Sequence, residues 1–298
     1  MPNAAKSPET KTAYGPVHRD HAVGCIDWLT AITSEDTADE YADEISTLLH
    51  RCRPDYKGVG STLKVDDCTI WLKRMSGRTV LFSFNPTPRF KKWRGRNGLK
   101  QFLQNELGEW SLKAQISRLD HSVTLPLDPK DVFCGIDFGP KRFVESTSDG
   151  NNGRTVYAGR IGRRKEVLLY DKMRQSRRTK NKIEHQCTRL EINYVPKIND
   201  RRMKVEELPF LIEHKPFRQI TRYEIELTLP KVRSCEQWRR FGQFEVMCER
   251  ESFVMARRVL SKRTNKNFVK LYSNFFERTL VTPNFDQIYN KALKEFFR

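Results

Sequence analysis

Residues 188–194 read Thr-Arg-Leu-Glu-Ile-Asn-Tyr, a run in which bulky apolar side chains alternate with polar ones. Successive side chains of an extended strand point to opposite faces of a sheet. Leu190 and Ile192 therefore belong to one face, and Arg189 and Glu191 belong to the other. The alternation predicts a strand that buries its apolar face and presents an arginine and a carboxylate side by side on the opposite face.

Two further segments, residues 117–120 and 221–224, repeat the order of hydroxyl, arginine, bulky apolar residue and carboxylate. Shorter runs of strand-forming residues accompany them, together with two amphipathic helices that we expect near 34–50 and 98–107. Elements of both kinds along one chain predict an α+β fold. We expect one or more curved antiparallel sheets, built from two strand–helix halves, with helices on one face.

The chain divides by composition into three segments. Residues 1–20 are polar, contain proline and lack periodicity, which is typical of a flexible terminus. Residues 21–230 carry the strand patterns and form the expected main domain. Residues 231–298 are richer in helix formers and have apolar residues three and four apart, so we expect a helical C-terminal region there.

The chain is strongly basic. Lys and Arg number 55 against 37 Asp and Glu, which gives a formal net charge of +18. Such an excess indicates a polyanionic partner, and we expect nucleic acid. No apolar run approaches the roughly 20 residues of a membrane helix, so no membrane partner or secretion signal is expected. The seven Cys include no C-x-x-C pair, which argues against a disulfide framework or zinc finger and fits a reducing cytoplasm.

Two clusters of basic residues are candidate nucleic-acid contacts. Residues 160–182 hold ten basic residues against only two acidic ones. The candidate contacts in this cluster are Arg163, Arg164, Lys165, Arg174, Arg177, Arg178, Lys180 and Lys182. Residues 89–96 interleave cations with aromatic rings that could stack on bases. The candidates there are Arg89, Lys91, Lys92, Trp93, Arg94 and Arg96. A solvated loop would also explain the first cluster, and anchoring of a loop to the core would also explain the second.

Tyr170 ends a short apolar strand inside the first cluster. A tyrosine hydroxyl can attack a phosphodiester when its proton is removed or its phenolate is stabilised by nearby cations. Carboxylates that converge on one polar sheet face, such as Asp120 and Glu191, could hold a divalent cation. The alternative is that Tyr170 belongs to the core and that each carboxylate only pairs with an arginine of a neighbouring strand.

Four motifs, in this order, resemble those of a known family. They are Ile-Asp-Trp-Leu-Thr at 26–30, Ser-Arg-Leu-Asp at 117–120, the segment from Tyr157 to Lys172, and Thr-Arg-Leu-Glu-Ile-Asn-Tyr at 188–194. Over residues 22–230 the chain resembles the rolling-circle replication initiators of staphylococcal-type plasmids and the replication initiation factors of filamentous phages. It departs from them at residues 159–163, where Gly-Arg-Ile-Gly-Arg replaces Gly-Ser-Arg or Gly-Ser-Lys.

The resemblance implies a DNA-nicking enzyme. Members of the family bind a replication origin and cut one strand with a tyrosine, which leaves a 5'-phosphotyrosine intermediate, and they use a divalent metal such as Mg²⁺ or Mn²⁺. Tyr170 would be the nucleophile, with Asp120 and Glu191 as metal ligands. The residues that would contact the scissile phosphate or position the tyrosine are Arg160, Lys172 and Arg189. Residues 21–230 would then be the catalytic domain.

The resemblance also implies partners and a cellular setting. The DNA partner would be an origin, double-stranded with an exposed single-stranded nick site. Members usually act as homodimers and recruit a helicase of the host or replicon, so we expect both here. The cytoplasm of a bacterial host is the expected location, with a plasmid, phage or similar mobile element as the replicon.

Several alternatives stay open at this point. A replication or regulatory protein that binds DNA without catalysis would keep the basic clusters and use the carboxylates as arginine partners. Glu224 could replace Glu191 as the metal ligand, although the spacing from Tyr170 favours Glu191. The six His form no His–apolar–His triplet, which disfavours an initiator with paired metal-binding histidines. No RNA-binding module is recognisable in the sequence.

Overall fold

The structure is a computed structural model, and the first residue that it describes is residue 22. The residues it describes are 22–54, 60–65, 68–86, 98–128, 133–136, 143–147, 154–158, 167–176, 183–195, 197–218, 220–228, 234–250, 256–257, 259–260, 271–281 and 285–297. The expected N-terminal segment of residues 1–20 lies outside them. None of the helices in these ranges is long and apolar enough to cross a membrane.

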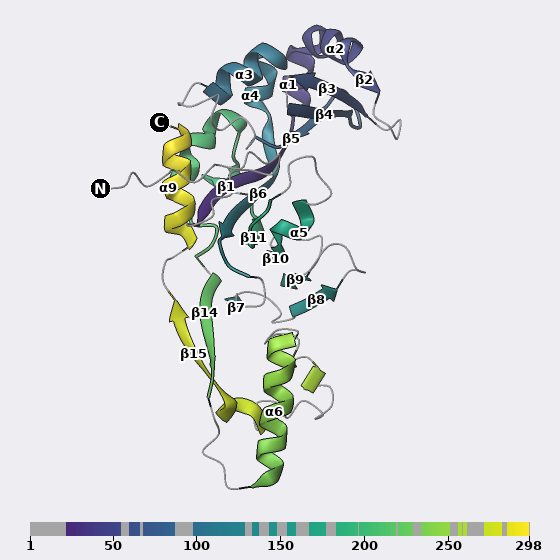
Figure 1. Cartoon of the computed structure of the whole chain (residues 1–298). Helices are drawn as coiled ribbons and strands as arrows, with labels where there is room; N and C mark the ends of the chain where they lie inside the picture. The colour runs from purple at the N-terminus through teal and green to yellow at the C-terminus, as the bar shows by residue number, and fades with distance from the viewer. Residues whose placement is uncertain are drawn as a thin grey trace, which may run out of the picture.

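A ten-stranded antiparallel sheet forms the centre of the molecule (Figure 1). Its strands follow the order β2-β3-β4-β5-β1-β6-β11-β10-β9-β8. The strands are β1 (Val23–Ile32), β2 (Arg53–Pro54), β3 (Ser61–Val65), β4 (Cys68–Arg74), β5 (Val80–Phe84), β6 (Gln115–Leu125), β8 (Phe143–Thr147), β9 (Arg154–Ala158), β10 (Val167–Asp171) and β11 (Thr188–Asn193). This architecture confirms the α+β class with an antiparallel sheet.

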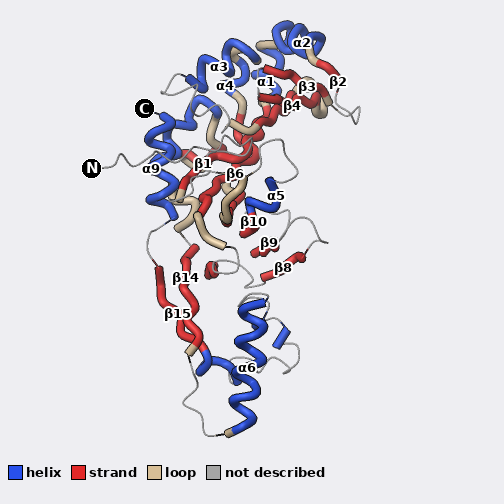
Figure 2. Tube along the Cα trace, in the orientation of Figure 1, coloured by secondary structure: helices blue, strands red, loops and turns tan. Residues whose placement is uncertain are grey.

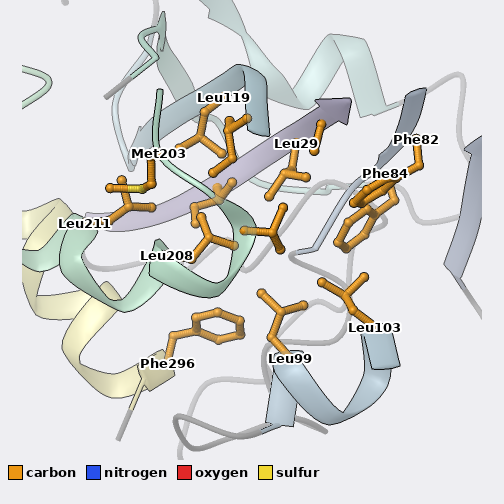
Figure 3. Packing of buried hydrophobic residues seen from close by; sticks show 14 of the residues in the cluster. Leu29, Phe82, Phe84, Leu99, Leu103, Leu119, Met203, Leu208, Leu211 and Phe296 are labelled. Carbon is orange, nitrogen blue, oxygen red and sulfur yellow. The ribbon is translucent and has the colours of Figure 1, made fainter. Parts of the chain in front are cut away.

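Helices cover one face of this sheet, as expected. They are α2 (Ala42–Arg51), α3 (Gly98–Glu106), α4 (Trp110–Lys113), the 3₁₀ helix η3 (Val205–Glu213) and α9 (Phe285–Phe297). Their apolar side chains form one core with those of the strands. Figure 3 shows Leu99 and Leu103 of α3 and Phe296 of α9 gathered near Leu29 of β1.

The two faces of the sheet differ in burial. On the side of the helices, which we call the covered face, side chains such as Leu29, Ile70 and Phe82 are fully buried. The residues that alternate with them, such as Thr30 and Trp71, are only partly buried. They belong to the opposite side of the sheet, which we call the open face.

One helix differs from the sequence prediction. The helix expected near 34–50 is two helices, because Tyr41 leaves helical backbone angles at φ −113° and ψ 26°. α1 (Glu35–Glu40) ends before this residue and α2 begins after it. The ammonium group of Lys113 in α4 lies 4.7 Å from the centre of the Tyr41 ring, so the break gives α4 a contact with this corner.

The C-terminal region contains a strand as well as the expected helices. β15 (Phe276–Val281) pairs with β14 (Ile220–Leu227), which also pairs with β7 (Phe133–Ile136) in a second sheet of three strands. Figure 2 shows β14 and β15 as a ribbon that leads away from the main sheet toward α6 (Cys235–Arg250). The remaining short elements are α5 (Lys172–Ser176), β12 (Lys197–Ile198), β13 (Arg201–Arg202) and η4 (Ser273–Phe275).

The two helical parts of the C-terminal region pack in different places. Phe241 and Phe244 of α6 form a second apolar cluster with Tyr272 and Phe275. α9 instead returns to the main sheet and lies against β1 (Figure 1). A Cβ atom at Gly24 of β1 would lie 2.5 Å from the backbone of α9, so this close approach requires glycine.

Candidate active site

Tyr170 of β10 lies beside the strand that carries Arg189 and Glu191. In the register of the sheet Tyr170 pairs with Arg189, so both side chains belong to the same face. Glu191 accepts a hydrogen bond from the Tyr170 hydroxyl. The Lys172 ammonium lies 3.4 Å from the same hydroxyl oxygen and donates to Oε1 of Gln175 at 2.9 Å. The Tyr170 oxygen thus contacts both a carboxylate and an ammonium group.

Arg189 joins this group to two more strands of the sheet. Its Nη1 donates to both carboxylate oxygens of Asp27 on β1, at 2.6 Å each. Its Nε donates to Oγ1 of Thr124 on β6 at 2.9 Å. The side chains of Arg189 and Lys172 are fully buried. Buried charges are costly unless they are paired and hydrogen-bonded, so these contacts hold the group in one arrangement.

We call this group, Asp27, Tyr170, Lys172, Arg189 and Glu191, the buried polar cluster. Asp27 is the member that the sequence pattern did not reveal. The residues on either side of Asp27 pair with consecutive residues of β6, so Asp27 is an extra residue in β1. Such a bulge re-aims a side chain. The available signal was a single carboxylate within the otherwise uncharged strand Val23–Ile32.

The two carboxyl groups of the cluster share a hydrogen bond with each other. Burial raises the pKa of Glu191 to about 8, and the charge of Asp27 adds to this shift. Burial alone would also raise the pKa of Asp27, but Arg189 and Lys172 outweigh it and hold that pKa below its usual value. Near neutral pH the pair therefore keeps one proton, on Glu191.

The same burial affects the candidate nucleophile and its cation. Burial raises the pKa of Tyr170 well above its usual value, and the Glu191 charge adds to the effect. Burial lowers the pKa of Lys172 to about 8, and the charge of Arg189 adds to that shift. The phenol stays protonated in this arrangement, so its deprotonation needs a base in contact with it. Glu191 is such a base once it has lost its own proton.

Asp120, the other predicted metal ligand, lies on the same face but outside the cluster. In the register it pairs with Asn193, two residues beyond Glu191 on β11. Its carboxylate accepts from Nε and Nη2 of Arg118, at 3.0 and 2.7 Å. Asp120 thus pairs with an arginine of its own strand β6, whereas the arginine-pairing alternative expected an arginine of a neighbouring strand.

The cluster fits a hard divalent cation in its ligand chemistry. Mg²⁺ is commonly held by one or two carboxylates together with water and phosphate oxygens. Asp27 supplies a buried carboxyl group, whose two oxygens Arg189 already contacts, and Glu191 supplies a partly buried one. Within the described ranges, no group of three or more His, Cys, Asp or Glu side chains is placed to hold a metal. Water or phosphate would therefore have to complete the coordination.

Arg174 is the predicted nucleic-acid contact that falls within the described residues. Its side chain is 53% exposed, and its Nε lies 3.5 Å from Oδ2 of Asp171. The other predicted contacts lie outside the described residues, as does Arg160. These are Arg89, Lys91, Lys92, Trp93, Arg94, Arg96, Arg163, Arg164, Lys165, Arg177, Arg178, Lys180 and Lys182.

The third repeat of the strand pattern lies in a different sheet from Tyr170. Glu224 belongs to β14, in the three-stranded sheet. Glu191 pairs in register with Leu168 of β10, the strand of Tyr170 itself. The topology therefore brings Glu191, and not Glu224, next to the candidate nucleophile.

Comparisons with known proteins find a likeness in structure but none in sequence. No protein-family model matches the chain, and no curated protein matches it in sequence. Among solved structures, the chain is similar to the rolling circle replication initiator protein from Geobacillus stearothermophilus. The identity is 14% and the TM-score 0.36, and the match covers 72% of this chain and 91% of that chain. A likeness at this level carries no argument about function, whereas the geometry of the buried polar cluster does.

Proposed function

We propose that this protein is a replication initiator that binds an origin and nicks one DNA strand through Tyr170. The observation that carries the proposal is the contact of a single tyrosine hydroxyl with both Glu191 and Lys172. A carboxylate that can take the proton and a cation that can stabilise the phenolate are what a tyrosine nucleophile needs. The order of the four motifs and the net charge of +18 support the same function.

In the proposed reaction Glu191, in its ionised form, takes the proton of the Tyr170 hydroxyl, and the Tyr170 oxygen attacks the phosphorus of one phosphodiester. The bond from phosphorus to the 3'-oxygen breaks, and that oxygen takes up a proton. One DNA end is then a free 3'-hydroxyl, and the other is a 5'-phosphate on Tyr170. Lys172 stabilises negative charge at the phenolate oxygen, and Arg189 holds Asp27 beside Glu191. The reverse reaction would rejoin the strand.

Mg²⁺ or Mn²⁺ is the proposed cofactor. Asp120 and Glu191 are the ligands that the motif order implies, and Asp27 joins them because it contacts Glu191. When bound near a scissile phosphate, such a cation neutralises its charge and polarises its P–O bonds. Replacement of Asp27 or Glu191 should therefore weaken metal-dependent cleavage more than replacement of Asp120.

The burial of Tyr170 favours a second candidate function. Only 5% of the residue is exposed, as for a core tyrosine whose hydroxyl is satisfied by a carboxylate. A replication or regulatory protein that binds DNA without catalysis would have this arrangement. The two candidates differ in whether the Tyr170 hydroxyl is needed to nick the DNA strand.

The test is incubation with supercoiled DNA of the protein's own replicon and Mg²⁺ or Mn²⁺, followed by a denaturing gel for nicked circles and for protein linked to DNA. Tyr170→Phe should abolish both products and leave origin binding within about twofold. Tyr272→Phe, a buried tyrosine of the second apolar cluster, is the matched control and should nick normally. Normal nicking by Tyr170→Phe would contradict the proposal. Binding without nicking by the wild-type protein would favour the non-catalytic candidate.

The proposal includes the expected partners. These are origin DNA with an exposed single-stranded nick site, a second copy of the chain and a helicase, within a bacterial cytoplasm. A homodimer would have twice the chain mass in light scattering, and a monomer under nicking conditions would remove that part of the proposal.

A further inference from the structure

The open face continues from the buried polar cluster across the N-terminal half of the sheet. We call its residues on β1 to β5 the N-terminal open face. The registers of these strands put the following side chains on it: Trp28, Thr30, Ile32, Arg53, Thr62, Lys64, Thr69, Trp71, Lys73, Leu81 and Ser83. The helices that cover the other side of these strands do not contribute to it.

This surface is accessible, whereas the cluster beside it is not. Arg53, Lys64 and Lys73 are exposed, and Trp28 and Trp71 are partly buried. A tryptophan that keeps part of its ring accessible offers a large flat apolar surface. The face therefore combines two partly buried tryptophans with exposed cations.

The charges of this surface have one sign. Arg53, Lys64 and Lys73 are its charged members, and all three are cations. A second copy of the chain placed face to face would set these cations against one another, so the charge pattern favours a polyanion as the occupant.

We propose that the N-terminal open face binds the single-stranded DNA that adjoins the nick site. Trp28 and Trp71 would stack on bases, and Arg53, Lys64 and Lys73 would contact phosphates. Stacking on an indole ring requires a base whose face is free, which an unpaired strand offers and a duplex does not. This inference rests on the proposed function, since it extends the same DNA substrate along the sheet.

The position of the surface fits a strand that leads into the buried polar cluster. Trp28 follows Asp27 directly in β1, and it pairs in register with Asp120. Trp71 lies on β4, two strands from β1, or about 10 Å across the sheet at the usual strand spacing. A segment of a few nucleotides would therefore span both rings and end near the scissile phosphate.

Binding of a dye-labelled single-stranded oligonucleotide of about 20 nucleotides, followed by fluorescence anisotropy, tests this inference. All variants carry Tyr170→Phe, so chemistry does not interfere. Trp71→Ala should weaken binding about tenfold, because stacking on one ring contributes on that order. Trp71→Phe keeps an aromatic ring and should bind within about threefold. The pair Lys64→Gln with Lys73→Gln should lower the slope of log affinity against log salt by about 1 to 2.

Lys100 of α3 and Lys291 of α9 provide the matched control, because both are exposed on helices of the covered side. Lys100→Gln with Lys291→Gln removes the same charge and should leave the affinity and its salt dependence near those of the parent. The inference is overturned if Trp71→Ala and the Lys64/Lys73 pair bind as tightly as this control. The inference is also overturned if unlabelled duplex DNA displaces the labelled oligonucleotide as well as unlabelled single-stranded DNA does. The Lys64/Lys73 pair provides the test if Trp71→Ala does not fold.

The two proposals fail separately. A wild-type protein that nicks DNA, together with unchanged single-strand binding by Trp71→Ala and the Lys64/Lys73 pair, would remove this inference and leave the proposed function. A wild-type protein that does not nick, together with weakened binding by Trp71→Ala, would remove the proposed function and leave the single-strand site.

Discussion

The two ends of the open face carry similar residue types in opposite surroundings. In the buried polar cluster the charged side chains are bonded to one another, and Arg189 and Lys172 are fully inaccessible. At β1 to β5 the cations Arg53, Lys64 and Lys73 are exposed around partly accessible tryptophans. One sheet face thus contains a fixed group of charges and, next to it, a charged surface open to a ligand.

The difference shows what burial does to a charge. A buried pair is strongly constrained, because leaving either partner alone costs several kcal/mol. An exposed cation contributes little to stability but can attract a polyanion over about a Debye length. The buried end therefore suits chemistry that needs fixed geometry, and the exposed end suits DNA binding that does not depend on the base sequence.

The largest effect is expected for Arg189→Met. The variant leaves the Asp27 carboxylate buried without the guanidinium nitrogen that contacts both its oxygens, so the unfolding free energy should fall by about 3–5 kcal/mol. Arg78→Met is the control, because its ion pair with Asp39 is exposed on both sides, at 73% and 60%, and its loss should cost less than about 1 kcal/mol. Urea unfolding of both variants measures the difference, and equal losses would break the comparison between the two ends.

Glu191→Gln should reduce nicking while it removes a pH-dependent loss of stability. Burial raises the pKa of Glu191 from 4.5 to about 8, so the folded state binds this proton more tightly than the unfolded state. The stabilisation that the protonated Glu191 provides is complete below pH 4.5 and is lost as the pH rises through 8. The drop in unfolding free energy between pH 5 and pH 8 should shrink in the variant, by on the order of 2 kcal/mol.

The nicking rate of Glu191→Gln should fall by about 10² to 10⁴ because the variant lacks the base that takes the Tyr170 proton. Unfolding curves across this pH range and nicking rates at one pH are the two measurements. A variant with the wild-type pH profile of stability would show that Glu191 ionises normally in the folded protein.

Gly24→Ala tests the covered face of the same strand. A Cβ at this position would lie 2.5 Å from Cα of Tyr289, so α9 would have to shift, at a cost of about 1–3 kcal/mol. Gly242→Ala is the control because a Cβ there meets nothing within 4 Å, and alanine should stabilise the α6 helix by up to about 1 kcal/mol. The thermal unfolding midpoint should fall for Gly24→Ala and rise for Gly242→Ala. An unchanged midpoint for Gly24→Ala would show that α9 packs less tightly against β1 than described.

The smallest effect on stability is expected at the N-terminal open face. Lys73→Gln should change the unfolding free energy by less than about 0.5 kcal/mol, because the side chain is exposed. The same variant should weaken single-stranded DNA binding measurably at low salt. A loss of stability comparable to that of Arg189→Met would mean that the two ends do not differ as described.

The sequence singled out Tyr170 and Glu191 as candidate site residues because strand alternation and motif spacing are local properties, and in the structure the two side chains are in contact. Asp27 could not be assigned in the same way. Its role depends on a bulge in β1 and on Arg189, which lies 162 positions away in the chain. The pattern of a single segment predicts neither the bulge at Asp27 nor its pairing with Arg189.

The C-terminal region shows the same limit. β15 has only six residues, and its pairing partner β14 lies about 50 residues earlier, so the surrounding helix formers dominated the local pattern. The return of α9 to the main sheet depends on contacts across the whole chain. One of them is the bond of 2.5 Å between Nδ1 of His121 and the hydroxyl of Tyr289. Burial lowers the pKa of His121 to about 4 and keeps its ring neutral in this contact.

The central claim is that Tyr170 forms a covalent bond with DNA, and the most direct test identifies the modified residue. The protein is incubated with a single-stranded oligonucleotide that carries the nick site and with Mg²⁺ or Mn²⁺, then digested with protease and nuclease and analysed by tandem mass spectrometry. The predicted result is a nucleotide phosphate on the peptide that contains Tyr170, at Tyr170 itself. A modification at another residue, or none under conditions in which the oligonucleotide is bound, would contradict the claim.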